Sequence, residues 1–108
     1  MYSLDWQSPA HGGRVKAHHA MDLPFVFDNT DVADTTAGAP GARELAAQIS
    51  ATWIAFARNG SPDNPAIPRW PAYTADRATM ILDTDCHVAS DPDRKARRLW
   101  SRVVASEA

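Results

Sequence analysis

The longest regular pattern in the chain runs from Ala42 to Gly60 and reads ARELAAQISATWIAFARNG. Large apolar residues recur there at steps of four, four and three, at Leu45, Ile49, Trp53 and Phe56. This spacing predicts an amphipathic helix of roughly 17 residues. Gly60 directly follows the pattern and predicts a left-handed helix cap. An apolar face of this width requires a broad surface to pack against.

A second amphipathic helix is predicted in SDPDRKARRLWSRVVASEA, near the end of the chain. Ser90 or Asp91 is the candidate N-cap, and Pro92 falls in the expected first turn. Apolar residues follow at helical spacing: Ala96, Leu99, Trp100, Val103 and Val104. We expect the tryptophans of both helices, Trp53 and Trp100, to be buried against the rest of the protein.

Two short stretches are predicted to be strands, YSLDW at Tyr2–Trp6 and ATMILD at Ala78–Asp83. Residues 28–41 and the proline-rich stretch after Gly60 are predicted to be loops, with Trp70 holding the second loop onto the protein body. Two strands do not form a sheet that is stable by itself. The apolar faces of the two helices need a broader surface than two strands provide, which indicates that part of the fold is missing from this chain.

Composition excludes several classes of function. The chain has 108 residues, which is enough for one domain, and its net charge of -2 argues against binding nucleic acid or an anionic membrane. Cys86 is the single cysteine, so the chain forms no internal disulfide. No apolar run has the length of a membrane span. The first residues do not resemble a signal peptide, so the cytoplasm is the default expectation.

Five basic side chains crowd the second predicted helix. They are Arg94, Lys95, Arg97, Arg98 and Arg102. Phosphate contact is one interpretation of this cluster. A solvated face opposite the apolar one is the interpretation that we prefer, because acidic residues elsewhere cancel the charge. A basic-helix nucleic-acid binder therefore ranks last among the functions considered.

Two adjacent histidines, His18 and His19, stand in the stretch KAHHAMDLPFVF. A histidine in a loop after a strand, followed by an apolar anchor, is how a hydrolase presents a general base, since imidazole titrates near neutral pH. Both histidines are equally compatible with ordinary loop residues, which is the commoner case. Asp22 lies three residues after His19, and we expect it to cap the following short segment rather than to orient the imidazole.

Other kinds of site find less support. Adjacent loop histidines point in different directions, and His11 and His87 are isolated, so no metal site is predicted. The sequence contains no G-x-S-x-G elbow and no phosphate-binding loop. No cofactor is predicted. A histidine base without a serine at a strand-to-helix turn lacks the nucleophile that it would serve.

The segment HAMDLPFVF, His19 to Phe27, resembles the catalytic-histidine segment of type B carboxylesterases, the family of cholinesterases and bacterial para-nitrobenzyl esterases. That segment typically reads His, a small residue or Gly, any residue, an acid, an aliphatic, any residue, an aromatic, Val and Phe. Ala20 stands where Gly is common, and the other positions fit. The segments YSLDW, TWIAFARNGSPDNP, IPRWPAY, ATMILD and RRLWSRV follow the order of the family, so the resemblance covers nearly the whole chain.

The resemblance implies an α/β fold. Residues 1–108 would form the C-terminal part of a carboxylesterase type B domain, an incomplete α/β-hydrolase fold with two short strands and two main amphipathic helices. His19 would be the triad histidine, and His18 has no matched role. The serine, the acid and the oxyanion hole would lie outside this chain.

The resemblance also implies hydrolysis of a carboxylic ester by a serine, histidine and carboxylate acting together. The chain alone is expected to be inactive and to act on a small-molecule ester only when the missing portion is supplied. The alternative is a non-catalytic module that binds a partner chain. In either case we expect an exposed sheet edge to favour self-association. No nucleic acid or membrane partner is expected.

Overall fold

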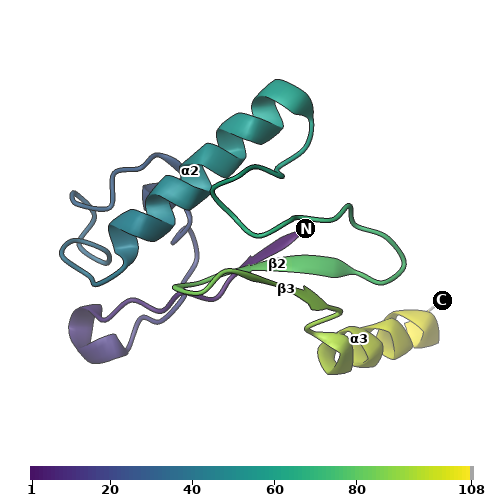
Figure 1. Ribbon diagram of the computed structural model, residues 1–108. Coiled ribbons are helices and arrows are strands. Elements are labelled where there is room, and N and C mark those ends of the chain that lie inside the picture. Colours follow the sequence, from purple (N-terminus) through teal and green to yellow (C-terminus); the bar gives the residue numbers. More distant parts are fainter. Residues whose placement is uncertain (108) are drawn as a thin grey trace.

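A three-stranded sheet forms the centre of the computed structural model, which describes residues 1–107 (Figure 1). The strands are β1 at Tyr2–Leu4, β2 at Ala78–Leu82 and β3 at His87–Ser90. Their order in the sheet is β1-β2-β3, with β1 parallel to β2 and β3 antiparallel to β2. One edge of β1 therefore has no partner strand among the described residues.

The segment that connects β1 to β2 carries most of the remaining structure. It contains a short 3-10 turn at Ala10–Gly13, the one-turn helix α1 at Leu23–Val26 and the long helix α2 at Ala42–Asn59. The last helix, α3 at Arg94–Glu107, follows β3 and extends away from α2 (Figure 1). A parallel pair of strands requires such a long connection, because a tight turn joins only antiparallel strands.

Helix α2 confirms the helix predicted from the apolar spacing. Its buried face includes Leu45, Ile49 and Thr52. Gly60 ends the helix in a left-handed conformation with φ 72°, and its backbone N–H donates to the Phe56 carbonyl at 2.8 Å. The far end of the stripe is not covered, because the Phe56 side chain is 58% exposed.

The core lies where α2 meets the sheet and the segment around α1. Its buried members are Trp6, Met21, Phe25, Ala42, Leu45, Ala46, Ile49, Ile67, Trp70, Met80, Leu82 and Cys86. Trp6 meets Phe25 edge-to-face with ring centroids 5.1 Å apart. Trp70 is buried, which confirms that it holds its loop onto the body. Burial of each large apolar side chain stabilises the fold by roughly 1.5–3 kcal/mol.

Several details of the predicted elements were wrong. A third strand, β3, was missed because HVAS is short and its side chains are mostly exposed, so it carries no clear alternation. Helix α3 begins at Arg94, while Ser90 belongs to β3, so neither Ser90 nor Asp91 is its N-cap. Trp100 is 66% exposed rather than buried. Trp53, which was also expected to be buried, is only partly buried against the core.

Helix α3 is attached mainly at its first turn. Its apolar face is open to solvent, and none of its described residues is buried. The Asp91 carboxylate accepts two hydrogen bonds from Arg97, at 2.9 and 2.7 Å, and lies 3.5 Å from the Arg94 guanidinium. The backbone N–H of Asp91 donates to the Arg77 carbonyl at 3.2 Å, which ties this turn to the sheet. Two members of the basic cluster, Arg94 and Arg97, are thus paired with Asp91 where α3 begins.

We expect the isolated chain to self-associate, with an associated fraction that rises with protein concentration. Exposed apolar side chains on α3 and the free edge of β1 both favour contacts between copies. The double substitution W100E and V104E should reduce association, measured by sedimentation velocity. The matched control is V32E, since Val32 is 77% exposed outside α3. A monodisperse monomer with a sharp, cooperative unfolding transition would show this expectation to be wrong.

The attachment of α3 should depend on pH through Asp91. Hydrogen bonds from Arg97 are the main cause that lowers the pKa of Asp91 below its ordinary 3.8. Stability from this group is complete above that ordinary value and is lost as the pH falls through the lowered folded-state pKa. Titration from about pH 7 to about pH 2, followed by NMR helical shifts, should therefore show the first turn of α3 loosening late. D91N should loosen the turn at neutral pH, and D85N should not.

Candidate active-site histidine

The candidate site begins at the carboxyl end of β1, where the chain leaves the sheet. The backbone N–H groups of Asp5 and Trp6 both donate to the Leu82 carbonyl, at 2.9 and 3.3 Å. This shared acceptor ends regular pairing one residue after Leu4, so β1 is shorter than the predicted strand Tyr2–Trp6. In α/β sheets, loops at the carboxyl ends of parallel strands carry functional residues.

The loop that follows is closed at its base by Ser8. Its backbone N–H donates to the Lys16 carbonyl at 3.4 Å, and its buried hydroxyl donates to the Thr35 carbonyl. These contacts join both sides of the loop and fasten it to the segment before α2. The chain therefore enters the histidine region from a fixed point. His11 lies exposed within this loop and His87 lies exposed on β3, each apart from the histidine pair.

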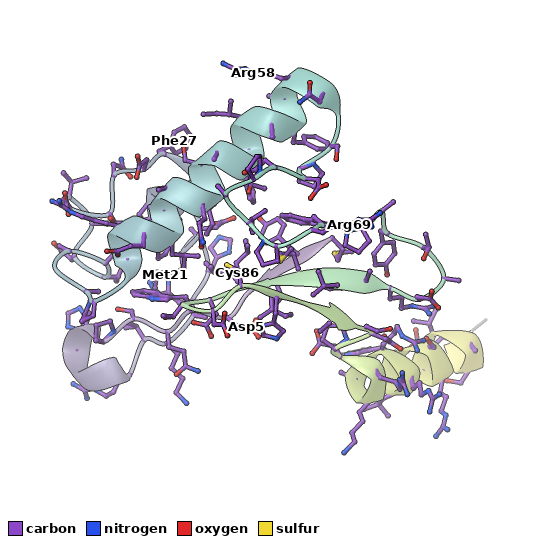
Figure 2. All side chains as sticks on the ribbon, in the orientation of Figure 1. Asp5, Met21, Phe27, Arg58, Arg69 and Cys86 are labelled. Atoms are coloured by element: carbon purple, nitrogen blue, oxygen red, sulfur yellow. The ribbon has the colours of Figure 1, made fainter. Side chains whose placement is uncertain are left out.

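His18 and His19 lie in a tight turn with exposed side chains. The Met21 N–H donates to the His18 carbonyl at 3.1 Å, and Ala20 adopts a left-handed conformation with φ 63°. Met21 itself is 1% exposed and anchors the turn near the N-terminal end of α2 (Figure 2). A buried anchor directly beside an exposed tip holds the His19 backbone while its ring remains accessible.

The two histidine rings differ in what they bind. Nδ1 of His18 donates to the His19 carbonyl at 2.7 Å, and a carbonyl only accepts, so Nδ1 carries the proton in this hydrogen bond. His18 thus closes the turn, a role that the sequence did not indicate. The His19 ring has no hydrogen bond to any residue in the described range 1–107. Its nitrogens are free for groups outside this chain.

Asp22 neither orients His19 nor caps α1 with its side chain. It stands at the N-cap position of α1, as expected, but makes no side-chain cap hydrogen bond. Its Oδ2 instead accepts a hydrogen bond from the Tyr2 hydroxyl at 2.9 Å. Burial is the main cause that raises the pKa of Tyr2, and the hydrogen bond and charge of Asp22 add to it. The phenol therefore remains a donor at neutral pH.

The one cysteine of the chain shows no sign of acting as a nucleophile. Cys86 is buried, and burial raises the pKa of its thiol, which disfavours the reactive thiolate. No cluster of three or more potential metal-ligating side chains occurs in the described part of the chain. None of the helices that the structure describes is both long and apolar enough to cross a membrane.

An apolar cleft of about 260 Å³ lies between the start of β1 and the C-terminal half of α2. It is lined by Met1, Tyr2, Thr52, Trp53, Phe56, Pro62 and Trp70. Its lining thus includes Tyr2 of β1 and the exposed Phe56 at the far end of the α2 stripe. An apolar surface beside free backbone donors and acceptors is suited to receive another segment of polypeptide.

Comparison with known proteins identifies relatives of this chain. The model of the carboxylesterase family matches residues 1–100. The chain is 38% identical over 102 residues to the para-nitrobenzyl esterase of Bacillus subtilis, covering 91% of this chain and 20% of that protein. It is 32% identical over 100 residues to the phenmedipham hydrolase of Pseudarthrobacter oxydans, covering 83% of this chain and 20% of that protein.

Solved structures agree with this assignment. An esterase from Clostridium hathewayi, described as able to hydrolyse aliphatic aromatic polyesters, has a TM-score of 0.81 and 31% identity, covering 94% of this chain and 20% of that one. A para-nitrobenzyl esterase structure has a TM-score of 0.78 and 37% identity, covering 91% of this chain and 21% of that one. These neighbours are α/β-hydrolase esterases, so the predicted α/β fold class is confirmed. The chain spans about a fifth of their length.

Because Ala20 has a left-handed conformation, replacement of alanine by glycine should have opposite effects on stability at Ala20 and at Ala47 of α2. A20G should raise the free energy of unfolding by up to about 1 kcal/mol, because glycine adopts positive φ without strain. A47G, on the exposed side of α2, should lower it by about 1 kcal/mol. Urea denaturation followed by tryptophan fluorescence measures both. Destabilisation of similar size by both glycines would contradict the left-handed turn.

Proposed function

Because this chain belongs to the carboxylesterase family, we propose that it supplies the general-base histidine, His19, of a serine ester hydrolase site. The observation that carries the proposal is the presentation of the His19 ring. It lies at an exposed turn after the carboxyl end of β1, while Met21 and Asp22 beside it are anchored. Among residues 1–107, no side chain binds the ring, so both nitrogens are available to a serine and a carboxylate from another segment.

The reaction follows from the roles that such a triad requires. The His19 imidazole removes the proton of the serine hydroxyl as that oxygen attacks the ester carbonyl. The imidazolium then protonates the departing alcohol, and the cycle repeats with water to release the carboxylic acid. A carboxylate on the second ring nitrogen holds the tautomer that keeps the other nitrogen basic. The substrate class is carboxylic esters.

The complementary segment has a defined place to dock in this proposal. It would pair with the unpaired edge of β1 and fill the apolar cleft beside Trp53 and Phe56. It would also cover the open face of α3. The chain spans about 20% of the para-nitrobenzyl esterase that it resembles, which leaves most of a hydrolase body to supply these contacts. Docking of that body would cover the exposed apolar surfaces and would bring a serine and a carboxylate to the free imidazole of His19.

A chimaera tests the assignment of His19. The segment of the Bacillus subtilis para-nitrobenzyl esterase that aligns with this chain is replaced by residues 1–108. The chimaera should hydrolyse p-nitrophenyl acetate, and H19A should reduce kcat/KM by a factor on the order of 10⁶, towards background. H18A should retain most activity, because the His18 ring has no place in the proposed triad and the Met21 and Tyr2–Asp22 anchors of the turn remain.

The controls separate catalysis from background reactivity. The isolated chain should hydrolyse the ester no faster than an equal concentration of imidazole. Saturable turnover by the isolated chain, lost in H19A, would require a nucleophile within residues 1–108 and refute the assignment of the serine to another segment. A folded chimaera that is inactive with His19 intact, or equally impaired by H18A and H19A, would refute the role of His19. Binding of the body without activity would favour the non-catalytic module.

A further inference from the structure

Tyr2 connects three parts of the fold through its backbone and its side chain. Its backbone pairs with Met80 in the parallel ladder of β1 and β2. Its ring meets the Trp53 indole of α2 edge-on, with centroids 5.0 Å apart and planes at 72°. Its hydroxyl donates to Oδ2 of Asp22 at 2.9 Å, three residues beyond His19. The sheet, the long helix and the histidine turn therefore meet at this tyrosine.

The backbone transmits the position of Asp22 to His19. Two overlapping turns cover the interval, with the Met21 N–H donating to the His18 carbonyl at 3.1 Å and the Leu23 N–H donating to the Ala20 carbonyl at 3.2 Å. Met21, between Asp22 and the tip, is fully packed in the core. Asp22 and the His19 backbone thus belong to one hydrogen-bonded unit, and a contact that fixes one restrains the other.

We propose that Tyr2 is a positioning residue that fixes the His19 turn against β1 and α2 through its hydrogen bond to Asp22. The inference rests on the proposed function of His19 as the general base. A base must stay within hydrogen-bond reach of the proton that it removes, and misplacement of about 1 Å costs up to about a hundredfold in rate. The exposed tip carries no packing of its own around the imidazole. Its placement therefore depends on the anchors on either side. The Ser8 contacts and the His18 hydrogen bond restrain the chain before the tip, and the packing of Met21 and the Tyr2–Asp22 hydrogen bond restrain it after the tip.

Substitution of Tyr2 by Phe isolates the hydroxyl, because phenylalanine keeps the ring that packs on Trp53. Tyr73 offers a matched control. It is 50% exposed, and its hydroxyl makes no hydrogen bond within the described residues. Y73F removes a tyrosine hydroxyl that has no proposed role in positioning His19. At the acceptor, D22A removes the carboxylate, and D22E keeps a carboxylate on a longer side chain.

The test uses the active chimaera and measures kcat, KM and the burst amplitude, which counts competent sites. Y2F and D22A should each lower kcat per competent site by about tenfold or more, with KM nearly unchanged. The double variant should lose no more than the larger single loss, because the two groups act as one unit. D22E should recover part of the rate, and Y73F should match the parent.

The outcomes distinguish this inference from the assignment of His19 itself. A fall in burst amplitude with unchanged kcat per competent site would mean that Tyr2 only supports folding, and would overturn the positioning role. Additive losses in the double variant would overturn it as well. If H19A abolishes turnover while Y2F equals Y73F, the positioning role fails alone. If H19A leaves turnover intact, the proposed function fails first.

Discussion

The edge-to-face contact between Trp6 and Phe25 is the constraint on which the histidine region depends. Trp6 marks the exit from β1 and Phe25 lies in α1, so their contact closes the intervening loop upon itself. Both are almost completely buried in the core that also contains Leu45 and Ile49 of α2, and the loop between them is held by hydrogen bonds such as those of Ser8. Since closing a longer loop costs little additional free energy, one strong hydrophobic closure permits an elaborate exposed turn. The packing of Trp6 and Phe25 in the core thus restrains the loop that carries His19.

Regular elements with a strong local signal were predictable from the sequence. Helix α2 combines period, length and a glycine stop, and Leu45 and Ile49 of the predicted stripe are buried, whereas Phe56 at its far end is exposed. Strand β3 and the start of α3 were not predictable. HVAS is too short and too exposed to show alternation, and the proline and aspartates before Arg94 satisfy capping rules at more than one position. Strand β3 depends on antiparallel pairing with β2, and the start of α3 depends on the contacts of Asp91 with Arg97 and with the Arg77 carbonyl. The residue pattern of a single segment reveals neither set of contacts.

The candidate site divides in the same way. His19 was predicted to be the base because its signal is contiguous, a histidine followed by an acid and an apolar anchor, and this role remains a proposal. The hydrogen bond between Asp22 and Tyr2 was missed because the two residues lie 20 positions apart in the sequence. No periodicity connects a strand residue to an N-cap acid. The conformation at Ala20 had an indirect signal, since a family position that is commonly glycine indicates positive φ, and this chain meets the requirement with an alanine.

The open face of α3 has a consequence for how the chain comes apart. A helix of 14 residues is marginal in water without tertiary packing, and α3 contributes no buried residue to the core. Its opening is therefore energetically separate from unfolding of the sheet and α2, which makes it a distinct foldon. Native-state exchange would register two populations of amides, and protease cleavage within α3 would leave the remaining fold intact. Association with a covering body would merge the two units into one cooperative transition.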